Sequence, residues 1–177
     1  MFCCGSEQGS AGASRAIHQD RTLISFVVSS GGQPQAEGKF TEFNGQIAID
    51  FDNPHQAGVS FEVASRSIDV GSPSLNEYLR GEQFFKAASY PVISFVSTSV
   101  EKIDADRALV TGNFFLLGVT KQISLDVQLD RKPGGGQMLA FRAIGTIDRR
   151  DFGMNAAYPV IGESVRIVVT TEVVDGP

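Results

Sequence analysis

Strict alternation of apolar and polar residues most limits how this chain can fold. Over residues 121–130, Ile, Leu, Val and Leu occupy every second position and polar residues fill the places between. Successive side chains of a strand point to opposite faces, so this pattern predicts a strand with one dry face and one wet face. Shorter runs of the same kind occur at 47–51, 59–63 and 165–169.

Turn-forming residues separate these runs and divide the chain into about eight strands. An Asn-Gly pair at 44–45 inside the second strand is compatible with a hairpin turn of its own. We expect a bulge or bend there instead, because the apolar pattern resumes directly after it. The eight expected strands lie at about 22–30, 37–52, 57–69, 90–102, 107–118, 120–132, 137–150 and 163–174.

Eight antiparallel strands in sequence can stack as two sheets or close into an up-and-down barrel without edges. The expected strands are long enough for a barrel wall on the order of 25 Å tall, which favours closure. A chain of 177 residues suits one domain. We expect an all-β barrel over residues 17–177 and a flexible N-terminal tail over residues 1–16.

A short helical insert is expected between the third and fourth strands. Ser74 and Glu77 have the spacing of a capping box, and Gly81 is placed to end the helix. This segment is expected to cover the mouth of the barrel. Its apolar residues, with the aromatic pair that follows, are Leu75, Tyr78, Leu79, Phe84 and Phe85.

Composition narrows the classes of partner. The net charge is −5 and the basic residues are scattered, which argues against a nucleic-acid surface. No apolar run reaches the roughly 18 residues of a membrane-spanning helix. The chain has 13 Phe, 3 Tyr and no Trp, a bias towards rings without a polar group that suits an apolar cavity.

The two cysteines lie next to each other near the N-terminus. Cys3 and Cys4 have neither a metal-ligand spacing nor the spacing of a disulfide framework. Two interpretations remain for this segment: the remnant of a lipid-attachment site, or a disordered tail.

Residues suited to catalysis or metal binding are sparse, so we expect no enzyme, no metal and no cofactor. His18 and His55 have no carboxylate or Cys partner at metal-ligand spacing, and no Ser lies in a nucleophile elbow. The charged run 148–151, Asp-Arg-Arg-Asp, either closes one barrel end as a network or receives an anionic head group. Arg80 and Lys121 are further candidates for a head-group contact.

Several blocks in this order resemble the YceI-like family of lipocalin-like barrels. They are Leu-Arg-Gly-Glu-Gln-Phe-Phe at 79–85, Tyr-Pro-Val-Ile-Ser-Phe at 90–95, Leu-Gly-Val-Thr-Lys at 117–121 and Arg-Arg-Asp-Phe-Gly-Met at 149–154. The resemblance covers about residues 17–174. It implies a barrel whose lumen holds a polyisoprenoid, an isoprenoid quinone or a similar lipid, typically in the periplasm. Two histidines frequent in the family are replaced here by Tyr78 and by Ser29 or Ser30.

Alternation and resemblance together predict a carrier that shields an apolar chain, and we also expect it to associate peripherally with a membrane. Two alternatives stay open: a barrel enzyme that isomerises or cyclises an apolar substrate through Glu62 or Asp69, and a secreted stress-related protein with a filled barrel. Small residues at 112, 143 and 145 either leave an open channel or interlock with large ones. The expected ligand contacts are Phe26, Phe40, Phe61, Tyr78, Leu79, Arg80, Phe84, Phe85, Ile93, Phe95, Phe114, Leu125, Phe141 and Ile167.

Overall fold

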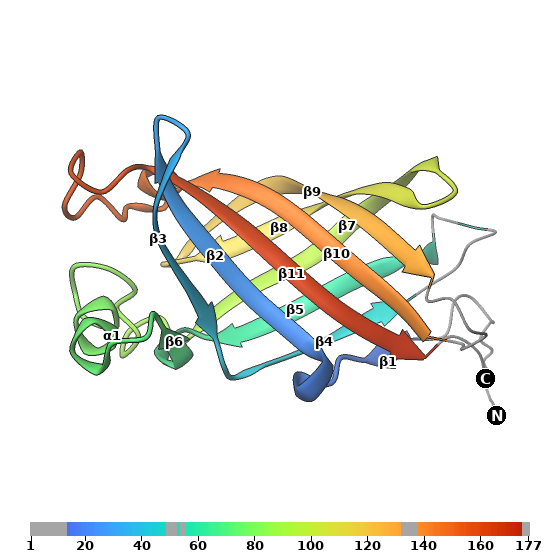
Figure 1. The fold of residues 1–177 in the computed structure, drawn as a ribbon, viewed down its shortest axis with the longest axis horizontal. Helices are drawn as coiled ribbons and strands as arrows, with labels where there is room; N and C mark the ends of the chain where they lie inside the picture. The colour runs from blue at the N-terminus through green and yellow to red at the C-terminus, as the bar shows by residue number, and fades with distance from the viewer. Residues whose placement is uncertain (1–13, 49–52, 54–55, 132–137, 175–177) are drawn as a thin grey trace, which may run out of the picture.

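One antiparallel sheet curls around the apolar interior (Figure 1). The computed structural model describes residues 14–48, 53, 56–131 and 138–174. One short helix, α1 (Pro73–Leu79), lies between β6 and β7. The strands are β1 (Ser14–Ala16), β2 (Thr22–Ser30), β3 (Gln33–Phe40), β4 (Phe43–Ala48), β5 (Gly58–Ala64), β6 (Ile68–Asp69), β7 (Val92–Asp104), β8 (Arg107–Leu116), β9 (Val119–Arg131), β10 (Met138–Asp148) and β11 (Ser164–Val174).

The expected count of eight strands was wrong, because hydrogen bonding defines eleven. Three long stretches of the barrel wall are interrupted: β1 and β2 by the 3₁₀ turn η1 (Gln19–Arg21), β3 and β4 by Thr41 and Glu42, and β5 and β6 by the 3₁₀ turn η3 (Ser65–Ser67). Neighbouring stretches still pair on both sides of the breaks, since β2 pairs with β3 while β1 pairs with β4. The interruptions bend the wall and leave its topology intact.

The sheet order shows how the barrel closes. It runs β1-β4-β5-β7-β8-β9-β10-β11-β2-β3-β6, and β3 near one end of the order continues in the chain as β4 near the other. The last strand also pairs with the first long strand, from Ser164 opposite Ser29 to Thr171 opposite Thr22. This confirms the expected all-β, up-and-down barrel class.

The breaks lie elsewhere than the Asn-Gly pair indicated. Asn44 and Gly45 pair regularly with Glu62 and Phe61 of β5, so the expected bulge at 44–45 was wrong. Gly45 is needed for close approach, because a Cβ there would lie 2.5 Å from the Ser60 carbonyl oxygen. Residues 14–16, expected in the N-terminal tail, form β1 and extend the barrel.

The helix begins two residues earlier than the predicted capping box. Ser72 is the N-cap, its hydroxyl accepts the backbone N–H of Leu75 at 3.4 Å, and Pro73 occupies the first turn. Ser74 lies inside the helix, so the box at 74 and 77 was wrong. The C-cap is Arg80 in the right-handed region, not a left-handed glycine.

Candidate functional site

Two apolar cavities lie along the barrel interior. The helix-end cavity, about 190 Å³, is covered by α1, the segment after it and the loop before β11, which contribute Leu79, Phe84, Phe85, Met154 and Ile161. The hairpin-end cavity, about 150 Å³, ends at the β7–β8 hairpin and is lined by Ile47, Val59, Val100, Val110 and Leu129.

The helix-end cavity is lined almost wholly by aromatic and aliphatic side chains. Phe26 packs against Phe40 with ring centroids 5.6 Å apart, and Phe40 meets Phe85 edge-on at 5.8 Å. Its polar lining residues are Ser25, Ser94 and Arg149. Such a site attracts ligands through the non-directional hydrophobic effect.

Most of the side chains expected to contact ligand line one or both cavities. Phe61 and Leu125 line both, and Phe141 lines only the hairpin-end cavity. Those that line only the helix-end cavity are Phe26, Phe40, Leu79, Phe84, Phe85, Ile93, Phe95, Phe114 and Ile167.

Tyr78 and Arg80 line neither cavity. The Tyr78 side chain is 53% exposed and meets the buried Phe84 ring edge-on, with centroids 5.3 Å apart. Arg80 donates from Nε to the Arg66 carbonyl at 2.7 Å and from a terminal nitrogen to Glu77 Oε1 at 3.1 Å. The end of α1 therefore turns these two side chains away from the interior. Lys121, the other expected head-group contact, lies on the exposed surface.

Sequence reasoning missed the loop that completes the helix-end cavity, residues 153–163, which we name the closing loop. Met154 and Ile161 from this loop line the cavity, and no alternation marks them in the sequence. The side-chain amide of Gln35 on β3 holds the loop from outside. Its nitrogen donates to the Val160 carbonyl at 3.0 Å, and its oxygen accepts the Gly162 N–H at 2.7 Å.

Arg149 holds the closing loop from inside. Its side chain is 3% exposed and donates to the carbonyls of Gly162 at 2.8 Å, Met154 at 2.9 Å and Ile161 at 2.8 Å. Burial lowers the pKa of Arg149 below its ordinary value. Arginine stays charged in proteins, so the three carbonyl dipoles stabilise a buried cation.

The neighbouring charges form a network on the surface that also contacts the closing loop. Arg150 pairs with Asp148 at 2.7 Å and lies 4.6 Å from the centre of the Tyr158 ring. The hydrogen bonds between Arg150 and Asp148 lower the pKa of Asp148 and raise that of Arg150. Of the two interpretations of residues 148–151, these contacts favour the network that closes a barrel end.

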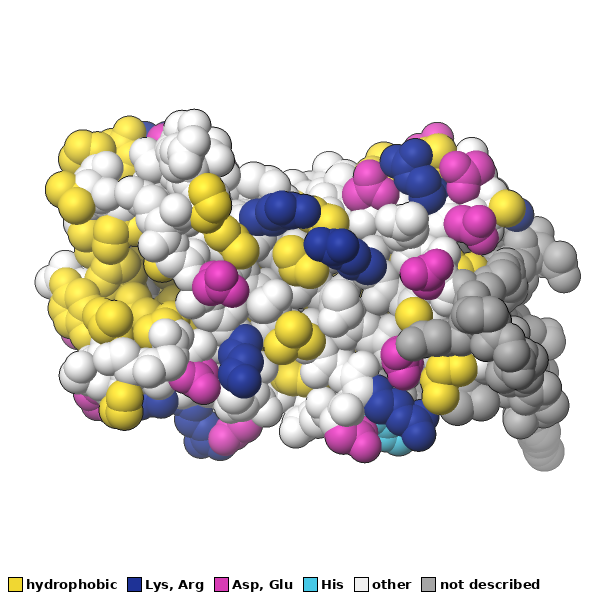
Figure 2. Space-filling model, in the orientation of Figure 1, with side chains coloured by type: hydrophobic (Ala, Val, Ile, Leu, Met, Phe, Trp, Pro, Cys, Tyr) yellow, Lys and Arg dark blue, Asp and Glu magenta, His cyan; other side chains and the backbone are white. Residues whose placement is uncertain are grey.

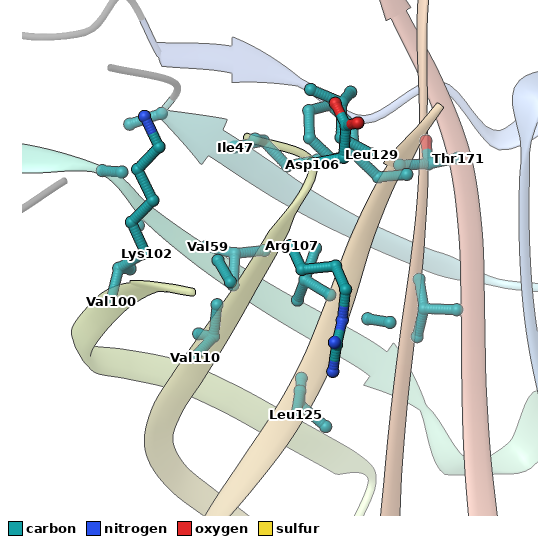
Figure 3. Close-up of a pocket in the computed structure, with 18 of the residues that line it drawn as sticks. Ile47, Val59, Val100, Lys102, Asp106, Arg107, Val110, Leu125, Leu129 and Thr171 are labelled. Carbon is teal, nitrogen blue, oxygen red and sulfur yellow. The ribbon is translucent and has the colours of Figure 1, made fainter. Parts of the chain in front are cut away.

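The hairpin-end cavity has charged residues where it opens. Lys102, Asp104, Asp106 and Arg107 line that end. Figure 3 shows Lys102, Asp106 and Arg107 among the residues that line this cavity. Arg107 pairs with Asp126 at 3.3 Å. The lining hydroxyl of Thr171 is satisfied by that of Thr22 at 2.6 Å, so the interior exposes no unpaired hydroxyl at that point.

Groups suited to catalysis are sparse within the described residues. The carboxylates that line either cavity are Asp104 and Asp106, both exposed, and Glu62 points outwards. No group of three or more His, Cys, Asp or Glu side chains suited to a metal occurs in the described part of the chain. Cys3, Cys4 and His55 lie outside the described residues. No described helix is long and apolar enough to cross a membrane.

Comparison with solved structures places the fold among known barrels. The BcnA crystal structure from Burkholderia cenocepacia superposes with a TM-score of 0.81 at 21% identity, covering 89% of this chain and 99% of that one. A polyisoprenoid-binding domain from Saccharophagus degradans, implicated in plant cell wall breakdown, superposes with a TM-score of 0.68 at 16% identity, covering 93% and 99%.

Sequence comparison gives the family. Protein YceI of Salmonella arizonae is 30% identical over 153 residues, which cover 85% of this chain and 80% of that protein. The YceI-like domain matches residues 16–173, from β1 to the last part of β11. The chain described here therefore belongs to the YceI-like family.

Proposed function

We propose that this protein binds a long apolar chain of the isoprenoid type inside the barrel and shields it from water. The observation that carries the proposal is the helix-end cavity, which is lined by aromatic and aliphatic side chains. The structural similarity to a polyisoprenoid-binding domain supports the same ligand class. Each methylene buried in such a site contributes about 0.8 kcal/mol, so a few isoprene units provide tight binding.

The proposed role is carriage or storage, without catalysis. Substrate activation needs a polar group near the reacting atoms, and the carboxylates that line the described cavities lie exposed at the hairpin end. Arg149 is the charged group that lines the helix-end cavity, and three carbonyls already hold it. Selection should therefore depend on the length and girth of the chain more than on its head group.

The helix end is the proposed place of entry from a lipid surface. Exposed apolar side chains gather there, including Leu75 at 51% and Val160 at 80% exposure. Figure 2 shows this concentration of hydrophobic side chains at the end of the molecule where α1 and the closing loop lie. We propose a periplasmic or secreted location, which rests on the family and not on any described segment.

Extraction of protein made in bacteria tests this function. Mass spectrometry of an organic extract should find an isoprenoid lipid at close to one per barrel, and added isoprenoid alcohols should raise the melting temperature. Absence of any extracted lipid, together with an unchanged melting temperature, would reject the carrier role.

A matched pair of variants ties binding to the cavity. Val28→Trp fills part of the helix-end cavity, whereas Val27→Trp adds the same ring to the neighbouring position of β2 that does not line either cavity. We expect the first to abolish the rise in melting temperature and the second to preserve it. Equal responses would place the bound chain somewhere else.

A further inference from the structure

The two cavities meet at three side chains. Phe61, Leu125 and Val169 line both of them, and each is buried. Residues two positions away on the same strands each line only one of the two cavities. On β5, Val63 lines only the helix-end cavity and Val59 only the hairpin-end cavity.

The same division occurs on the other two strands. On β9, Ile123 lines the helix-end cavity and Val127 the hairpin-end cavity. On β11, Ile167 and Thr171 divide in the same way. Phe61, Leu125 and Val169 therefore mark one level of the barrel.

These three residues approach the axis from different sides. β5 is separated from β9 by β7 and β8, β9 from β11 by β10, and β11 from β5 by β2 and the β3–β4 stretch. Side chains from three different strands of the wall therefore border both cavities at one level of the barrel. They mark the boundary between the two cavities.

Leu125 lies on a glycine that determines how far it reaches into the lumen. A Cβ on Gly145 would lie 2.5 Å from Leu125 Cδ2, so Leu125 occupies the space that a side chain at position 145 would fill. Phe61 is related to Gly45 in the same way, at 3.0 Å from Cδ1. At Gly45, however, the Cβ would also meet the Ser60 carbonyl oxygen, which cannot move aside. At Gly145 the Cβ would lie 3.2 Å from the Ser124 carbonyl oxygen, a tight contact that a small shift relieves, so a substitution there acts mainly by displacing the Leu125 side chain.

We infer that Phe61, Leu125 and Val169 form a gate that sets the length of apolar chain the barrel accepts, with Gly145 setting its bore through Leu125. Each cavity is comparable to the apolar cavity of about 150 Å³ that binds benzene, so each takes only a short stretch of chain. A short chain fills the helix-end cavity and stops at the gate. A longer one must displace Leu125 to reach the hairpin-end cavity. The inference rests on the proposed function and adds the residues that select length.

Binding of isoprenoid alcohols of increasing length tests the gate. Leu125→Ala opens it, so the longest alcohol bound should be longer than for the wild type. Affinity for such long alcohols should rise about tenfold for every two further methylenes buried. Gly145→Ala pushes Leu125 inwards, so the cut-off should move to shorter alcohols. Leu125→Val is the milder opening variant if removal of the whole side chain unfolds the barrel.

Two controls separate the gate from general loosening. Leu139→Ala truncates an equally buried leucine that lines neither cavity, and it should leave the cut-off unchanged. Gly38→Ala introduces a Cβ 2.7 Å from the Phe26 ring in the helix-end cavity. It should weaken binding of every alcohol without moving the cut-off.

A tryptophan reporter follows entry into the far cavity directly. The chain contains no Trp, and Phe141 lines only the hairpin-end cavity, so Phe141→Trp reports on that cavity alone. Short alcohols should leave its emission unchanged and long ones should shift it. Identical cut-offs in the wild type, Leu125→Ala and Gly145→Ala would reject the gate alone. Failure of every variant and of the wild type to bind any alcohol would reject the proposed function, and the gate with it.

Discussion

The two ends of the barrel enclose apolar space by different means. At the helix end, irregular chain covers the cavity: the segment after α1 contributes Phe84 and Phe85, and the closing loop contributes Met154 and Ile161. Arg149 and Gln35 hold the closing loop through its backbone groups. At the hairpin end, nearly all described residues that line the cavity come from strands and from the tight β7–β8 hairpin, and Ala57 comes from just before β5. Charged side chains lie where this cavity opens.

This difference shows what each kind of covering requires. A strand satisfies its backbone groups through its neighbours, so a cavity walled by strands needs only apolar side chains on the inner face. A loop over a cavity has no ladder, and its carbonyls must find donors elsewhere. The buried guanidinium of Arg149 supplies three of these donors. The helix end should therefore depend on a few polar contacts, and the hairpin end on packing.

The largest effect is expected from removal of the inner clamp. Arg149→Ala leaves three carbonyls of the closing loop without a donor and should lower the free energy of unfolding by about 4 kcal/mol. Arg149→Lys should lose most of this stability too, because an ammonium cannot match the planar guanidinium. Denaturant unfolding measures the loss. Arg150→Ala is the matched control: it removes an exposed ion pair and a ring contact with Tyr158 on the outside of the closing loop but no buried donor, and it should change stability little. Equal effects of the two substitutions would show that the loop does not depend on the clamp.

Truncation of the aromatic cover comes next. Phe84→Ala removes a buried ring over the helix-end cavity and should lower the unfolding free energy by about 3 kcal/mol, the low end for buried aromatics. Tyr78→Ala removes the exposed ring packed on its outer side and should cost much less. Thermal unfolding of both variants gives the comparison. A larger loss for Tyr78 would mean that the cover is held from outside.

Filling the hairpin-end cavity should raise the free energy of unfolding instead of lowering it. Ala143→Leu adds three carbons inside the hairpin-end cavity and should raise the unfolding free energy by about 1 kcal/mol, after some cost of repacking. Ala140→Leu adds the same group on the same strand at a position that lines neither cavity, and should give no such gain. Calorimetry of lipid-free protein distinguishes them. Destabilisation by Ala143→Leu alone would show that the wall cannot accept a larger side chain there.

The smallest effect concerns the base of the helical insert. The backbone N–H of Gly71 and the side chain of Asn76 donate to Asp69 and hold its pKa below the ordinary 3.8. A lowered folded pKa contributes stability above the unfolded pKa, and that stability is lost as pH falls through the folded pKa. Wild-type melting temperature should therefore fall more steeply below about pH 4 than that of Asp69→Asn. If the melting temperatures of the two proteins fall in parallel with pH, Asp69 makes no such contribution.

Local rules predicted the strands well and their interruptions poorly. Alternation placed Ile167 and Leu125 on the inner face, where the structure has them. The break at Thr41 and Glu42 has no turn signal, because it follows from the strand bending to pair with β6 and then with β5. The Asn-Gly pair two residues later suggested a bulge, yet Gly45 serves close approach inside a regular strand.

The same limit applies to the site. Phe84 and Phe85 were placed over the cavity from their position after a helix, and that placement agrees with the structure. Tyr78 and Arg80 were expected to contact the ligand too, but both side chains turn away from the cavities. Their orientation is set by how the insert packs on the barrel and by the contacts of Arg80 with Arg66 and Glu77, which join elements that no local pattern relates. The role of each lining residue in binding stays a prediction.

What the amino-acid order alone determined was the inner face of each long strand, because a period of two depends only on neighbouring residues. It also favoured the barrel class, since long antiparallel strands that follow one another in the chain have few ways to hide their edges. Tertiary structure alone decided that the lumen divides at Phe61, Leu125 and Val169, and that Arg149 clamps a loop. Both depend on side chains from distant strands meeting in space, which no local pattern records.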